Sequence, residues 1–137
     1  MKAFGIWLAI VAVVFGVYAL VTISLRETTQ VYVFVDSSNQ MATKSSALRR
    51  ELGELNDRER TEFALAAGQD FSGAELVHGW QEELALPADQ GFFGPCSFDG
   101  AASFPEASDA DERILVTVAG NSCDTSALTD WQIIELD

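Results

Sequence analysis

The amino-terminal part of the chain is an uninterrupted apolar run. No charged residue occurs between Lys2 and Arg26, and the 23 positions between them are mostly aliphatic or aromatic. At about 1.5 Å per residue, a helix of this length reaches about 34 Å, enough to cross a hydrocarbon core of about 30 Å. The pattern therefore predicts a transmembrane helix in residues 1–25, and Lys2 favours a cytoplasmic amino terminus.

Two other interpretations of this run stay open. A cleaved signal peptide is one, with Val17-Tyr18-Ala19 as a small-residue cleavage site. Because apolar residues continue beyond Ala19 to Leu25, the pattern favours an uncleaved anchor. A buried helix of a soluble core is the other, but 23 uncharged positions are long for it.

The pattern changes after a short polar tether at residues 26–30. Residues 31–35 are β-branched or aromatic on both faces and are followed by Asp36, which is typical of a central strand in a parallel sheet. Similar runs predict strands at residues 62–67, 75–80, 113–119 and 130–136. Residues 62–67 also fit a continued helix, but Asn56-Asp57-Arg58 interrupts the helical spacing before them, so we favour a strand.

Helical spacing occurs once after the tether. Apolar or small residues recur near every 3.6 positions and predict an amphipathic helix over residues 40–55: Met41, Ser45, Leu48, Leu52 and Leu55. A short helical turn is expected at residues 126–128. Strand followed by helix is the start of an α/β unit. We therefore expect a small α/β domain in residues 31–137, with a mostly parallel sheet of about five strands.

Residues 87–111 predict a long loop, because Pro87, Pro95, Pro105 and several glycines interrupt any regular element. The loop also contains four phenylalanines: Phe92, Phe93, Phe98 and Phe104. Such side chains either pack beneath the loop or present an apolar surface to a protein partner or a membrane. Packing is the favoured interpretation, and partner binding is the alternative.

Charge is distributed unevenly along the chain. The net charge is −13, and residues 61–137 contain fifteen acidic residues against one basic residue, Arg113, whereas residues 26–60 contain six of each. This balance excludes a nucleic-acid partner, because phosphate binding needs a basic face. It favours a cationic or cation-bridged protein partner, and adaptation to high salt is the alternative explanation of the acidity.

Cys96 and Cys123 are the two cysteines of the chain. In an exported domain an even pair indicates one structural disulfide, and the spacing excludes a Cys-x-x-Cys redox motif. Two free thiols are the alternative. His78 is the one histidine, and no Gly-x-Ser-x-Gly elbow or metal-spaced histidine set accompanies it. We therefore expect His78 to be structural.

The string Val33-Phe-Val-Asp36-Ser-Ser38-Asn-Gln40-Met41 resembles the opening of a von Willebrand factor A domain. That family begins with an apolar strand ending in Asp-x-Ser-x-Ser, followed by an amphipathic helix, a strand and an antiparallel edge strand. The resemblance covers residues 31–136 and implies that residues 63–67 and 75–80 form the latter two strands.

The resemblance also implies a divalent cation, Mg²⁺ or Ca²⁺, held by oxygen ligands at the carboxyl ends of the strands. Asp36 and Ser38 match ligand positions, whereas Gln40 stands where the family has a serine and Ala119 where it has an aspartate. The alternative is that Asp36-Ser-Ser-Asn caps a helix at a strand-to-helix turn. We favour capping and expect no resident cofactor.

These patterns lead to one expected function and two alternatives. We expect a single-pass membrane protein whose extracytoplasmic domain is a non-enzymatic interaction or assembly module, an accessory subunit of a membrane complex. One alternative is a metal-dependent adhesion module of the A-domain type. The other is an enzyme whose site assembles around Asp36, Ser38 and His78.

Overall fold

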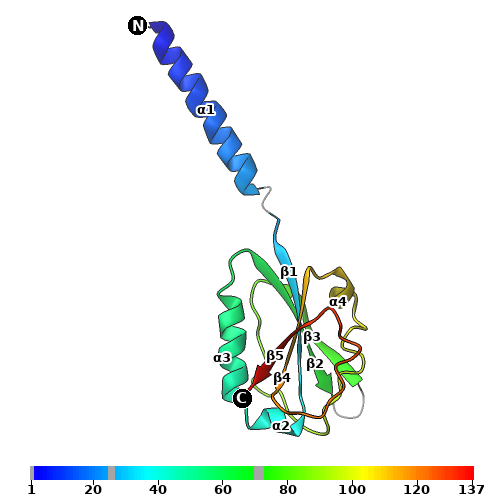
Figure 1. Cartoon of the computed structure of the whole chain (residues 1–137). Coiled ribbons are helices and arrows are strands. Elements are labelled where there is room, and N and C mark those ends of the chain that lie inside the picture. Colours follow the sequence, from blue (N-terminus) through cyan, green and yellow to red (C-terminus); the bar gives the residue numbers. More distant parts are fainter. Residues whose placement is uncertain (1, 25–26, 70–72) are drawn as a thin grey trace.

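The computed structural model describes residues 2–24, 27–69 and 73–137. Met1, Leu25 and Arg26, which belong to the predicted anchor and tether, lie outside the described residues. The first element is a long helix, α1 (Lys2–Ser24), and the folded domain begins with the first strand, β1 (Thr29–Val35). Four residues separate these two elements, so the domain follows the helix closely (Figure 1).

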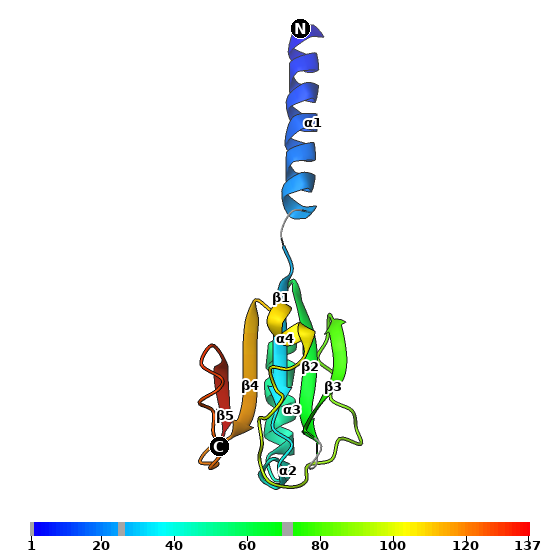
Figure 2. The same cartoon turned by 90° about the vertical axis from the view of Figure 1, so that its right-hand side faces the viewer.

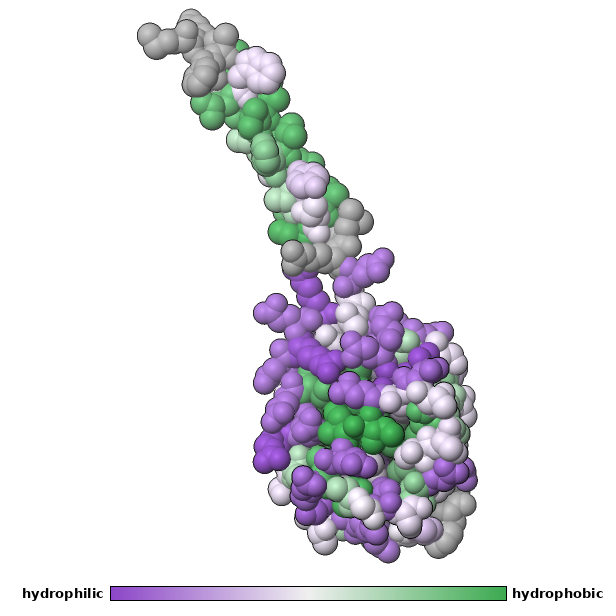
Figure 3. Space-filling view, viewed as in Figure 1, coloured by the Kyte–Doolittle hydropathy of each residue, from purple (hydrophilic) through white to green (hydrophobic). Residues whose placement is uncertain are grey.

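Helix α1 is long and apolar enough to cross a membrane. Its segment Gly5–Ile23 has a mean hydropathy of 2.6, and none of it is buried against the rest of the protein. Apolar surface covers much of the helix in Figure 3. Because a helix that is apolar all round is stable only when something covers it, a membrane is its natural surrounding. A signal sequence meets the same criteria.

The domain is built on a five-stranded sheet in the order β3-β2-β1-β4-β5 (Figure 2). The other strands are β2 (Thr61–Gln69), β3 (Gly73–Gln81), β4 (Glu112–Val118) and β5 (Gln132–Leu136). β1 pairs in parallel with β2 and β4, and β4 with β5, whereas β3 pairs antiparallel with β2. The sheet is therefore mixed, which corrects the expectation of a mostly parallel sheet. Only three residues separate β2 from β3, too few for a parallel crossover.

The predicted helix over residues 40–55 is two helices, α2 (Asn39–Ala42) and α3 (Ser45–Asn56). The backbone of Lys44 leaves the helical region at φ −110° and ψ 11°, and its N–H donates to Met41 O, which closes the turn between them. Met41, Leu48, Leu52 and Leu55 are all buried, so the break preserves one apolar side. Hydrophobic spacing identified the buried residues but not the turn.

Two further predictions concern the loops. The short turn expected at residues 126–128 is present and is closed by a hydrogen bond from Leu128 N to Thr125 O. The predicted loop 87–111, in contrast, contains a short helix, α4 (Pro105–Asp109). Pro105 occupies its first turn, where a missing N–H costs nothing. The prediction of strand rather than helix for residues 62–67 is confirmed by β2.

Each face of the sheet is covered by a different layer. Odd-numbered residues of β1, such as Val33, pack with α2 and α3 in one apolar cluster. Even-numbered residues, Tyr32 and Phe34, face the opposite layer, which consists of α4 and the loops on either side of β4. There Trp131 meets the ring of Tyr32 edge-on at 5.6 Å between centroids. Both faces of β1 are thus buried, as its continuous apolar sequence predicts.

The two ends of the sheet have different positions relative to α1. Five residue steps separate Ser24 from Thr29, and an extended chain spans about 3.6 Å per step, or about 18 Å in total. The amino ends of the parallel strands therefore lie next to α1. Their carboxyl ends lie at the opposite end of the domain, as Figures 1 and 2 show. We call this the distal end.

Candidate functional site: the distal end of the sheet

The distal end contains the point where the direction of the strand order reverses. From β1 the chain builds outward first through β2 and β3, and then crosses to β4 and β5 on the other side of β1. In open α/β sheets, ligands bind in the crevice outside the carboxyl ends of the strands at such a point. Asp36 follows β1 here, and Thr117 lies near the end of the adjacent strand β4.

Asp36 is the centre of a hydrogen-bond network and is only 1% exposed. Its Oδ1 accepts a hydrogen bond from the N–H of Ser38 at 2.9 Å, and its Oδ2 accepts one from the hydroxyl of Thr117 at 2.9 Å. The side chain of Asn121 donates in turn to Thr117 Oγ1. Because both carboxylate oxygens have protein donors, Asp36 joins the turn after β1 to β4.

Ser38 occupies the position just before α2 and is 3% exposed. Its backbone is extended, and its side chain makes no capping hydrogen bond. Among the described residues, its buried Oγ has no hydrogen-bond partner. The carboxylate of Asp36 therefore holds the turn before α2, but neither Asp36 nor Ser38 caps an N–H of the helix, so the capping interpretation is not confirmed.

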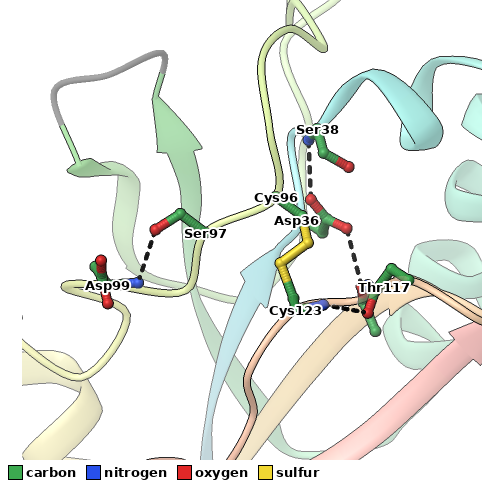
Figure 4. The surroundings of a disulfide bond; sticks show 8 residues. Asp36, Ser38, Cys96, Ser97, Asp99, Thr117 and Cys123 are labelled. Carbon is green, nitrogen blue, oxygen red and sulfur yellow. Dashed lines mark hydrogen bonds between the residues drawn. A yellow bond between two sulfur atoms is a disulfide. The ribbon is translucent and has the colours of Figure 1, made fainter.

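A disulfide between Cys96 and Cys123 closes over this network (Figure 4). It connects the loop after β3 to the loop after β4, and the two Cα atoms lie 6.0 Å apart. The N–H of Cys123 donates to Asn121 Oδ1 at 3.4 Å, which links the disulfide to the Asp36 network. On the other side, the N–H of Phe93 donates to Ser37 O at 2.8 Å. The loops at the distal end are thus anchored to the ends of the strands.

A cavity of about 660 Å³ lies at the distal end. The turn 38–40, residues 94–99 and residues 122–124 line it. Asp99 and Asp124 belong to this lining and are exposed. Hydrogen bonds from the side chain and N–H of Ser126 lower the pKa of Asp124, which keeps its carboxylate charged. The lining contains no lysine or arginine, so its charge is negative.

The residues present do not form the divalent-cation site that the family resemblance implies. Gln40 is exposed, and Ala119 has no ligand atom, so two of the implied positions are not filled by carboxylate or hydroxyl groups. In the described part of the chain, no three histidine, cysteine, aspartate or glutamate side chains come together. Asp36 and Ser38 do lie side by side, but we derive no chemistry through a metal there.

His78 does not join Asp36 and Ser38. It pairs with Leu65 in β2, and Leu65 pairs with Val33 in β1, so His78 is two strands away from β1. At about 4.8 Å per strand this separation is about 10 Å across the sheet. The imidazole instead contacts Gly79 O through Nδ1 at 2.8 Å and Ala85 N through Nε2 at 3.4 Å. Both contacts are with main-chain atoms.

The four phenylalanines have separate locations. Phe98 is buried and Phe104 partly buried in the layer over Tyr32 and Phe34, whereas Phe92 packs on the side of α3. Phe93 differs, because 62% of it is exposed. Of the predicted partner-binding group, Phe93 is thus the one that presents an apolar surface at the distal end.

Sequence reasoning missed Thr117, Asn121, Asp99 and Asp124 as members of this site. Thr117 lies within an apolar strand, where a threonine is read as an ordinary β-branched residue. The other three residues do not belong to a recognisable sequence motif. One usable signal was the position of Asn121 and Asp124 just after a predicted buried strand, since the ends of parallel strands gather at one edge.

Comparison of the chain with protein-family models, with curated proteins and with solved structures finds no match.

Proposed function

We propose that this chain is a membrane-anchored, extracytoplasmic interaction module without enzymatic activity, and an accessory subunit of a membrane complex. The proposal depends on the structure of the distal end. It is stabilised by a disulfide and by a buried carboxylate with two protein donors, and it presents Phe93 and an acidic cavity away from α1. Binding residues in proteins are often located on loops that a rigid scaffold positions.

The proposed location outside the cytoplasm is supported by two features together. A disulfide persists in oxidising compartments, and α1 is suited to a membrane span. The acidic character of residues 61–137 then faces the exported side. Shortened membership of the von Willebrand factor A family is part of the proposal, supported by the turn after β1 and by the antiparallel strand β3.

The test uses the full-length chain, purified with an affinity tag from its own membranes in a mild detergent. We expect a complex of fixed stoichiometry. Phe93→Ala should reduce partner recovery about tenfold, corresponding to a loss of about 1.4 kcal/mol of binding free energy. Arg50→Ala is the matched control, because Arg50 is exposed on α3 and is not among the residues that line the cavity. A monodisperse monomer without any partner contradicts the proposal.

A further inference from the structure

The two edges of the sheet differ in how they are protected. Strand β3, at one edge, has two register shifts against β2, and such irregularities bend an edge away from other strands. Strand β5, at the other edge, keeps a continuous register with β4 over five residue pairs. It is short, but it contains no proline, lysine or bulge. By these criteria β5 is the edge that is open to another strand.

The outward main-chain groups of β5 can be assigned from the inward ones. Ala119 N donates to Leu136 O at 2.9 Å, so the main-chain groups of Leu136 face β4. In a strand, successive residues direct these groups to opposite sides. The N–H and C=O groups of Ile133 and Glu135 therefore face outward. In the described part of the chain no strand lies beyond β5 to pair with them.

The surroundings of this edge combine apolar surface with negative charge. Ile133 is 39% exposed, and Figure 3, which views the domain from the β5 side, shows an apolar area amid polar residues. The acidic residues are Asp130, Glu135 and Asp137, and residues 114–137 contain no lysine or arginine. A second copy of this chain would bring the same carboxylates face to face, which opposes self-pairing.

We propose that the outer edge of β5 binds an extended, basic segment of a partner protein as an added strand. The segment's main chain pairs with the outward groups of Ile133 and Glu135, its apolar side chains cover Ile133, and its basic side chains face the carboxylates. This inference rests on the proposed function as an interaction module and names the chemistry of its partner. Addition of a strand to an open edge is a general mode of peptide recognition.

The first experiment uses the full-length, isotopically labelled chain in detergent micelles and two synthetic peptides of equal length. One peptide alternates lysine and valine, and the other alternates glutamate and valine. We expect the basic peptide to slow amide exchange at Ile133 and Glu135, and its affinity to fall with added salt. Absence of slowing at low-millimolar peptide, slowing confined to other residues, or equal binding of the acidic peptide overturns the proposal.

Two substitutions locate the effect. Ile133→Pro removes an outward N–H from an edge position where proline is tolerated, and Ile133→Val is its matched control. We expect Ile133→Pro to lower the affinity for the basic peptide about tenfold or more. Ile133→Val should change this affinity less than about threefold. Glu135→Lys leaves the main chain unaltered and should shift preference toward the acidic peptide. Unchanged binding in Ile133→Pro and Glu135→Lys, with circular dichroism unchanged, overturns the proposal.

The same variants separate this inference from the proposed function. Partner recovery from membranes that persists with Ile133→Pro but falls with Phe93→Ala supports the interaction module and overturns the β5 edge as its contact. If the purified chain forms dimers and Ile133→Pro dissociates them, the occupant of the β5 edge is a second copy of this chain. That result overturns the proposal of a different partner protein. Loss of the native partner with Ile133→Pro, but not with Ile133→Val, supports both.

Discussion

Asp36 and Ser38 stand two residues apart in one turn, yet their side chains have opposite surroundings. The Asp36 carboxylate accepts hydrogen bonds from Ser38 N and Thr117 Oγ1, whereas the Ser38 hydroxyl is buried and, among the described residues, unpaired. A buried polar group without a hydrogen-bond partner costs free energy. Removal of a buried acceptor imposes this cost on each donor that it leaves unpaired. The two positions therefore respond differently to substitution.

We expect Asp36→Ala to lower the free energy of unfolding by about 2–4 kcal/mol, because it leaves two buried donors without an acceptor. Ser38→Ala removes a hydroxyl without a partner and should change it by less than about 1 kcal/mol. Urea denaturation of the full-length chain in detergent, followed by tryptophan fluorescence, measures both. A loss in Ser38→Ala equal to that in Asp36→Ala would show that the Ser38 hydroxyl has an essential contact.

Tyr32 provides a pH-dependent prediction at the same scale. Its hydroxyl donates to Ala101 O at 2.7 Å, and burial, followed by the negative charge of Glu106, raises its pKa above the usual value. The folded state thus retains the phenolic proton that the unfolded chain loses near pH 10. This contribution to stability is complete below about pH 10 and is lost as pH rises, by about 1.4 kcal/mol per pH unit.

Tyr32→Phe should flatten this alkaline decline at a cost of about 1 kcal/mol at neutral pH, from the lost hydrogen bond to Ala101 O. Urea midpoints measured across alkaline pH for both proteins test the prediction. An equally steep decline in Tyr32→Phe would assign the effect to another group. Tyr18, the second tyrosine, lies in α1, so tyrosinate absorbance from the folded domain reports on Tyr32.

At the scale of elements, the layer that covers Tyr32 and Phe34 consists mostly of loops, and the disulfide joins these loops to each other. The loops on either side of β4 cover one face of the sheet with a single helix of five residues, α4. Apart from α4, the main-chain hydrogen bonds within these loops close single turns, such as those from Ala101 N to Phe98 O and from Leu128 N to Thr125 O. Cys96–Cys123, with a sequence separation of 27, joins the two loops at the distal end.

Replacing both cysteines by serine should lower the free energy of unfolding by about 3 kcal/mol, from the loop entropy regained by the unfolded chain. Urea unfolding with and without reductant measures this: the wild type should lose stability on reduction, and the variant should not respond. A wild type that is equally stable when reduced would show that loop packing alone maintains the layer. Alkylation without reductant checks that the thiols are paired.

At the scale of the whole molecule, the short connection between α1 and β1 determines which end of the domain is available. The amino end of β1 lies within about 18 Å of the end of α1. With α1 in a membrane, as we propose, a large partner has better access to the distal end and to the two sheet edges. The charge of residues 61–137 keeps these surfaces soluble and disfavours anionic partners.

The proposed orientation gives a prediction for the whole chain. With the domain outside the cytoplasm, alkaline phosphatase fused after Asp137 should be active, because that enzyme needs disulfides that form after export. The same fusion on a chain without residues 2–24 is the matched control and should be inactive. Activity without α1 would show that export does not depend on this helix, and inactivity of the full fusion would place the domain in the cytoplasm.

Much of the architecture follows from local sequence. The uncharged run defines α1, the two-sided apolar sequence of residues 31–35 defines a buried strand, and the spacing of Met41, Leu48 and Leu52 defines the apolar side of α2 and α3. These predictions succeed because side-chain periodicity directly reports which faces avoid water. The broken helix and α4 were missed because turns depend on a few backbone torsions that leave little trace in hydrophobic spacing.

The site and the open edge were decided by tertiary structure. Asp36 and Thr117 are 81 residues apart, and only the parallel pairing of β1 with β4 brings their side chains together. Likewise, the sequence of β5 does not say whether a strand lies beyond it; the order of the sheet does. Sequence alone determined what must be buried. The order in which the strands join the sheet determined which polar groups meet, because contacts between distant segments depend on topology and not on local pattern.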